Sequence, residues 1–189
     1  MSSILGRDNG IVLNEGYFAR RSALEWVFAA LVLAGGLFAF VRYQQSMNGY
    51  EQAILIGVIP AAIALGWFWR PLQALMGVVA AGALLAIASY GGDLARAEQV
   101  FWLKYFFSSQ SAILWMCMLV FISTVFYWLP VFIKGQGGTL ELLGSRLAWA
   151  AVVMALIGTM VRWYEGHQMG PDIGHIPVSN LYEVFVLFC

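Results

Sequence analysis

The residues of this chain whose types and spacing suit chemistry lie in a short segment at positions 174–183, with the sequence GHIPVSNLYE. This segment follows one apolar run of membrane length and precedes the start of another. It places His175, Asn180 and Glu183 at the mouth of a predicted membrane helix, where polar groups are costly and tend to be functional. Imidazole is a common axial ligand of haem iron, so ligation of haem or of another metal is one hypothesis for His175.

Simpler roles remain open for the same side chains. Asn180, with Glu183 three residues later, also matches an N-cap and its capping-box partner before an apolar run. His175 lies in a predicted loop before Pro177, where a histidine is more often simply solvated. His167 is expected to face solvent, and its spacing from His175 matches no recognisable metal site.

The composition indicates that lipid is the solvent for most of the chain. Hydrophobic residues make up 61% of the 189 residues and charged residues only 11%, against about 25% charged residues in soluble domains. The formal net charge is zero, which argues against a nucleic-acid partner. Cys117 is expected to be a small buried hydrophobe. It forms no Cys-x-x-Cys motif with Cys189, which argues against a redox dithiol, a zinc knuckle and covalent c-type haem attachment to this chain.

Five apolar runs are long enough to cross about 30 Å of hydrocarbon as helices. A sixth run begins at Val178 and stops at Cys189, which allows only about 18 Å of helix. We therefore predict an all-α integral membrane protein with five complete spans and a truncated sixth, as the N-terminal part of a longer protein. The predicted organisation is a cytoplasmic tail at 1–23 followed by a transmembrane bundle at 24–189. The complete spans are predicted at 24–41, 53–69, 72–90, 112–133 and 147–161, the last extending to Trp163 if Arg162 snorkels.

The distribution of Lys and Arg predicts a cytoplasmic N-terminus, because basic residues are enriched in cytoplasmic loops. With this orientation the segment at 174–183 faces outward, to the periplasm of a bacterial inner membrane. The outer stretch that leads into this segment also holds Glu165 and Asp172. The inner side has six basic residues and the outer side four, namely Arg7, Arg20, Arg21, Arg70, Lys134 and Arg146 inside, and Arg42, Arg96, Lys104 and Arg162 outside.

The connections between the runs have distinct compositions. Arg70 and Pro71 predict a tight turn between the second and third spans, and the glycines at 134–145 predict a flexible inner loop. Residues 100–107 are aromatic with one cation, which predicts an outer helix lying flat at the membrane surface. Glu25, near the start of the first span, is expected at the membrane interface.

The segment at 174–183 resembles the Gly-His-Phe-Pro-x-Ser-Asn-x-Tyr-Glu signature of the CcsA/ResC family. These are the cytochrome c biogenesis proteins of the system II type, labelled CcsB in beta-proteobacteria. Trp163 fits the same pattern, residues 24–39 are similar to the first helix of the long beta-proteobacterial form, and residues 100–115 to its outer loop and fourth helix. The motif positions are Gly174, His175, Pro177, Ser179, Asn180, Tyr182 and Glu183.

The resemblance implies a protein that handles haem in the bacterial inner membrane. Members of the family, with a ResB-like partner, move b-type haem to the outer face and promote its thioether attachment to the Cys-x-x-Cys-His of apocytochrome c. The family presents haem at a tryptophan-rich WWD segment that should follow the motif helix, and no tryptophan cluster occurs in this chain. The resemblance therefore implies a component of a haem-ligating complex that is inactive alone, with His175 as the candidate haem ligand.

Two other functions are open. A haem- or quinone-bearing anchor subunit of a respiratory complex would place histidines inside the spans, and neither histidine lies in an apolar run. A small-molecule transporter would use broken helices, for which Pro60 and the Gly35–Gly36 pair are candidates. The transporter hypothesis lacks paired ionisable groups at mid-membrane depth.

Overall fold

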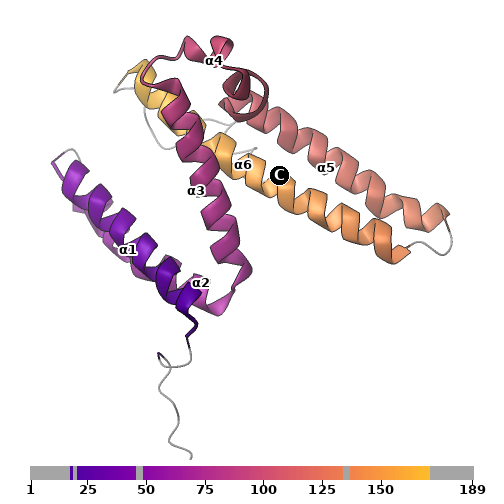
Figure 1. Cartoon of the computed structure of the whole chain (residues 1–189), viewed down its shortest axis with the longest axis horizontal. Helices are drawn as coiled ribbons and strands as arrows, with labels where there is room; N and C mark the ends of the chain where they lie inside the picture. The colour runs from indigo at the N-terminus through magenta and orange to yellow at the C-terminus, as the bar shows by residue number, and fades with distance from the viewer. Residues whose placement is uncertain (1–17, 19–20, 46–48, 134–136, 171–189) are drawn as a thin grey trace, which may run out of the picture. The chain divides into compact units, whose positions relative to one another are not determined.

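The structure is a computed structural model that describes residues 18, 21–45, 49–133 and 137–170. The motif at 174–183, the sixth apolar run and most of the predicted tail at 1–23 lie outside these residues. Every regular element in the described ranges is a helix (Figure 1). The elements are α1 (Ala23–Tyr43), α2 (Gly49–Phe68), α3 (Pro71–Tyr90), α4 (Arg96–Gln99), the π-helix η1 (Leu103–Phe107), α5 (Ser109–Phe132) and α6 (Gly137–Met169).

The helices have the length and composition of membrane spans. Within the described ranges, α1, α3, α5 and α6 are each long and apolar enough to cross a membrane, with mean hydropathy between 1.7 and 2.1. The apolar part of α2, Gln52–Phe68, falls just short of that length. The prediction of an all-α protein with membrane-type helices is therefore confirmed for the described residues.

The helix ends follow from local sequence signals. Ser22 and Glu25 form a capping box at the start of α1, and the Ser108 side chain caps α5 by accepting from the Ser111 N–H. The predicted turn at Arg70 is confirmed, because α2 ends at Phe68 and α3 begins at Pro71. Proline suits the first position of a helix, where its missing N–H costs nothing.

Helix α6 is longer than predicted at both ends. The flexible loop predicted at 134–145 is wrong from Gly137 onward, because α6 begins there. The stretch TLELLGSR after the glycine pair contains strong helix formers, and these outweigh the glycines. At the other end the helix continues beyond Trp163 to Met169 and stops before Gly170 and Pro171. The apolar run at 147–161 therefore predicted the membrane-length part of α6, but it did not predict where the helix begins and ends.

The predicted outer helix at 100–107 is shorter and less regular than expected. Val100 is not helical, residues 101–107 are helical, and the last five of these form η1. Leu103 is completely buried, whereas Phe101, Trp102 and Tyr105 are exposed. Leu103 therefore fixes this segment to the protein core, where Phe107 packs against the same cluster. Its flat placement at a membrane surface stays a prediction.

The structure also bears on the candidate helix breaks of the transporter hypothesis and on Cys117, whose expected burial is wrong. Pro60 lies inside the continuous helix α2, and Gly35 and Gly36 lie inside the continuous helix α1. A proline is tolerated in a membrane helix when its surroundings satisfy the freed backbone groups, so the broken helices that favoured a transporter are absent from α1 and α2. Cys117 is exposed on the surface of α5 and is not buried.

The chain divides into two compact units, and the first comprises Met1–Gln73. In this unit α1 and α2 run antiparallel, side by side (Figure 1). Glycines allow the two helices to approach closely, because a Cβ at Gly36 would collide with the Ile59 side chain and one at Gly66 with the Phe28 ring. Small residues at such contacts are typical of helices that pack in membranes.

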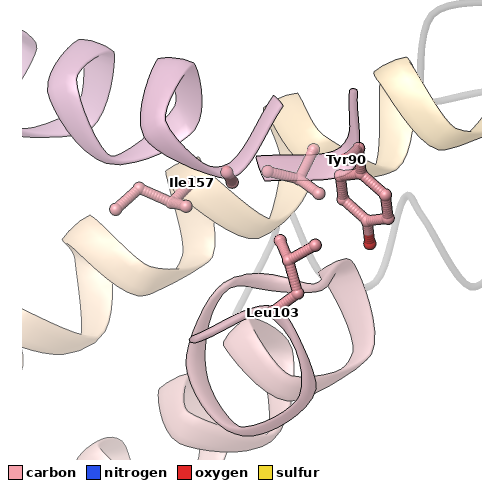
Figure 2. Close-up of a cluster of buried hydrophobic side chains, with 5 residues drawn as sticks. Tyr90, Leu103 and Ile157 are labelled. Atoms are coloured by element: carbon pink, nitrogen blue, oxygen red, sulfur yellow. The ribbon is translucent and has the colours of Figure 1, made fainter. Parts of the chain in front are cut away.

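The second unit comprises Ala74–Cys189. Its largest contact is the antiparallel pair of α5 and α6 (Figure 1). A buried cluster joins the end of α3 and the start of η1 to α6 (Figure 2), and its members are Ala86, Tyr90, Leu103, Ile157 and Val161.

Gly158 is a sensitive point of the α5–α6 contact. A Cβ at this position would lie 3.2 Å from the Ala112 Cβ and 3.3 Å from the Ile113 Cγ1. We expect Gly158→Leu to lower the free energy of unfolding by about 1–3 kcal/mol, the usual cost of overpacking. Gly77→Leu is the matched control, because a Cβ there meets nothing within 4 Å. Unfolding in mixed micelles measures both variants, and equal stability would contradict the close contact at Gly158.

Candidate functional site

The described residues bring one group of polar side chains together at the end of α6 that leads to the motif. Its centre is Glu165, which is only 8% exposed. The Tyr90 hydroxyl donates to Glu165 Oε1 at 2.5 Å, and the Ser109 backbone N–H donates to the same oxygen at 3.1 Å. The Ser109 hydroxyl donates to Oε2 at 2.5 Å. Arg162 Nη1 lies 4.0 Å from Oε2, one helical turn away on α6.

The three hydrogen bonds join the ends of three helices. Tyr90 is the last residue of α3, and Ser109 is the first residue of α5. The first N–H groups of a helix have no partner inside the helix, so Glu165 satisfies one of these donors on α5 from a different helix. A negative charge at the N-terminus of α5 is also favoured by the helix dipole. Both carboxylate oxygens accept hydrogen bonds, which matches an ionised, acceptor-only carboxylate.

Apolar side chains surround this carboxylate on one side. The Tyr164 ring contacts the Tyr90 ring at a centroid distance of 5.7 Å. Leu103 and Val161 are completely buried in the cluster that includes Tyr90 (Figure 2). Hydrogen bonds are electrostatically stronger in such a medium, and losing a partner is correspondingly costly. The arrangement is therefore suited to holding three helix ends in fixed positions.

An aromatic surface lies beside this group. The Phe106 and Trp115 rings are stacked, with centroids 5.7 Å apart and an interplanar angle of 3°. The Trp115 indole N–H donates to the Tyr105 carbonyl oxygen at 2.7 Å, which fixes η1 to the first turns of α5. Phe101 contacts both Tyr105 and Phe106. These rings form a connected surface next to the helix end that Glu165 caps.

A second buried carboxylate lies in the first unit. Glu25 is 2% exposed and accepts from the Ser22 N–H at 2.7 Å. Its Oε1 also lies 3.3 Å from Arg21 Nη1 and 3.4 Å from Arg70 Nε. The Trp67 indole N–H donates to the Glu25 carbonyl oxygen at 3.0 Å. Glu25 lies at a helix end, as expected, but it is enclosed by protein and ties the start of α1 to the end of α2.

The structure describes only part of the region in which the sequence predicted a functional site. His175 and the other motif positions lie outside the described residues. His167 is exposed in the last turn of α6, as predicted for a solvent-facing side chain. Within the described ranges, no group of His, Cys, Asp and Glu could hold a metal ion. The aromatic side chains at 101–106 and Trp115 lie in the same part of the second unit as Glu165, and the histidine of the described ranges, His167, is exposed.

Sequence reasoning placed Glu165 in the outer stretch before the motif but did not identify its partners. Tyr90 is 75 residues away and Ser109 is 56 residues away along the chain. An acidic residue within a membrane-type helix, close to its polar end, was the available signal. Its hydrogen-bond donors are known only from the packing of three helices.

Comparisons of this chain with known protein families, with curated proteins and with solved structures gave no match.

Proposed function

We propose that this chain is a membrane component of cytochrome c maturation that takes part in delivering haem to the outer face and in attaching it to apocytochrome c. The observation that carries the proposal is the GHIPVSNLYE segment at 174–183, which begins four residues after Gly170 at the end of α6. Haem is cargo in this function, and its vinyl groups supply the chemistry when it is bound. The protein residues bind and orient it. The partners are a ResB-like membrane protein and apocytochrome c.

The proposed topology has a cytoplasmic N-terminus and five spans in a bacterial inner membrane, with α2 as one of them. The antiparallel contact of α1 and α2 supports this count, because Trp67 at the end of α2 reaches the backbone of Glu25 at the start of α1. In this topology Tyr90, Ser109 and Glu165 belong to the periplasmic side. The hydrogen bonds among them require the end of α3, the start of α5 and the end of α6 to lie on one side of the membrane.

In this function Glu165 supports the chain that carries the motif. Helix α6 continues for one further turn after Glu165 and ends at Met169. The helix end that precedes the motif in the sequence is therefore tied to α3 and α5. Rigid support next to a binding residue helps to orient a bound cofactor, and this is the role we propose for Glu165.

The decisive experiment compares His175→Ala with the wild-type chain, each expressed in membranes with a ResB-like partner and purified. A reduced-minus-oxidised visible spectrum measures bound b-type haem. We expect a haem signal in the wild type and its loss, by about tenfold or more, in the variant, because an axial ligand is removed. His167→Ala is the matched control and should retain the signal, since His167 is exposed in the last turn of α6.

Two outcomes would contradict the assignment of His175. No haem in any sample would exclude ligation by this chain, and equal haem in His175→Ala and wild type would exclude His175 as the ligand. Loss of haem in His167→Ala alone would shift the ligand into the last turn of α6. A respiratory anchor subunit would instead need a histidine inside a span, and the surface position of His167 does not favour that alternative.

A further inference from the structure

Part of the Arg70 guanidinium group is exposed on the surface of the first unit. Its Nε lies 3.4 Å from Glu25 Oε1, yet its side chain is 74% exposed. The Arg70 side chain makes no other hydrogen bond or ion pair with the residues that the structure describes. One nitrogen therefore anchors the group, and its two terminal nitrogens are available to an external acceptor.

The charges around Arg70 favour an anion. Arg21 and Arg70 both approach Oε1 of Glu25, at 3.3 Å and 3.4 Å, so Arg70 shares this carboxylate oxygen with a second arginine. Helix α3 begins directly after Arg70 and has no acidic residue in its first turn, so the positive end of its dipole is not offset there. A planar guanidinium with two free nitrogens matches the oxygen geometry of a phosphate group.

The neighbouring surface is apolar, which identifies the source of that phosphate. Phe68, two residues before Arg70, and Leu24, next to Glu25, are both largely exposed. Trp26 is exposed as well and packs its ring against Trp67, with centroids 5.4 Å apart. Exposed aromatic and aliphatic side chains at helix ends are typical of contact with lipid at the membrane interface. A ligand with a phosphate and an acyl chain satisfies both the cation and this surface.

We infer that Arg70, anchored by Glu25, binds the phosphate of an anionic phospholipid at the end of the α1–α2 hairpin. Arg21 helps by holding the Glu25 carboxylate in place and by lying over the Trp67 ring, 5.4 Å from its centroid. The site differs from a general attraction of basic residues to lipid, because its guanidinium is held at one nitrogen. The inference does not depend on the role of the chain in cytochrome c maturation.

Native mass spectrometry of the full chain in detergent, titrated with phosphatidylglycerol, tests the site. We expect Arg70→Gln to weaken the tightest lipid-binding step by about tenfold or more, as the loss of a charge-assisted hydrogen bond does. Arg42→Gln is the matched control, since it also removes one exposed arginine from a helix end. Arg42 lies over the Tyr43 ring, 5.7 Å from its centroid, and has no carboxylate anchor among the described residues. Its loss should weaken binding by less than about threefold, as a general charge effect does.

Each other outcome would overturn the inference. Equal weakening by Arg70→Gln and Arg42→Gln would show general charge attraction only, and no weakening by Arg70→Gln would show that Arg70 binds no lipid. Competition by soluble glycerol phosphate would indicate a site for free phosphate and not for lipid. Thermal melting in neutral phosphatidylcholine checks that the variants fold. If Arg70→Gln does not fold, Arg70→Lys tests the site instead. Lysine keeps the positive charge but lacks the two terminal guanidinium nitrogens, so this variant should still weaken lipid binding.

Discussion

Glu165→Ala is expected to lower the free energy of unfolding by about 3 kcal/mol, the scale of losing hydrogen bonds to a buried charged group. The change leaves the Tyr90 hydroxyl and both donors of Ser109 without their partner, and all three belong to buried residues. It also removes the charge that stabilises the first turn of α5. Unfolding in mixed micelles, followed by circular dichroism, measures the loss.

Two variants separate this role from a general effect of removing a carboxylate. Glu98→Ala should change stability by less than about 0.5 kcal/mol, because the exposed Glu98 makes only a surface ion pair with Lys104, at 3.3 Å. Tyr90→Phe removes one of the three donors and should cost about 1 kcal/mol. If Glu165→Ala is as stable as Glu98→Ala, Glu165 does not hold the three helix ends together.

Leu103→Ala is expected to destabilise the second unit by about 2–4 kcal/mol, since removing a fully buried leucine leaves a cavity as well as losing apolar burial. Leu103 has no exposed surface and lies among Tyr90, Ile157 and Val161 (Figure 2). It is the buried residue of η1, so its loss should also release the aromatic surface from the core. The measurements are the free energy of unfolding and hydrogen exchange of residues 101–107.

Leu84→Ala is the matched control for this prediction. Leu84 lies in α3, but it is 65% exposed on the protein surface. Its truncation creates no internal cavity and should cost less than about 1 kcal/mol, as surface substitutions do. Faster exchange at 101–107 in Leu103→Ala alone would support the anchoring role. Unchanged exchange in both variants would mean that other contacts, such as the Phe106–Trp115 stack, hold this segment.

Helix class and approximate helix positions were accessible from the sequence. The apolar runs predicted α1, α3 and α5 to within a few residues, and the turn at Arg70 was correct because proline restricts the backbone locally. The ends of α6 were wrong, since polar residues can continue a helix beyond the apolar part that lipid requires. The tight turn and the capping residues depend on neighbours in the chain, and such signals are readable without a fold.

The composition and the motif at 174–183 are properties of the sequence alone, and they support the membrane character and the hypothesis of a role in haem delivery. Tertiary structure decided which polar residues act together. Glu165 receives its donors from Tyr90 and Ser109, and Glu25 lies against Arg70, 45 residues away. A hydrophobic pattern specifies that a helix is buried in lipid, but it does not specify which faces of two helices meet. That choice depends on side-chain packing between distant segments, such as Gly158 against Ala112.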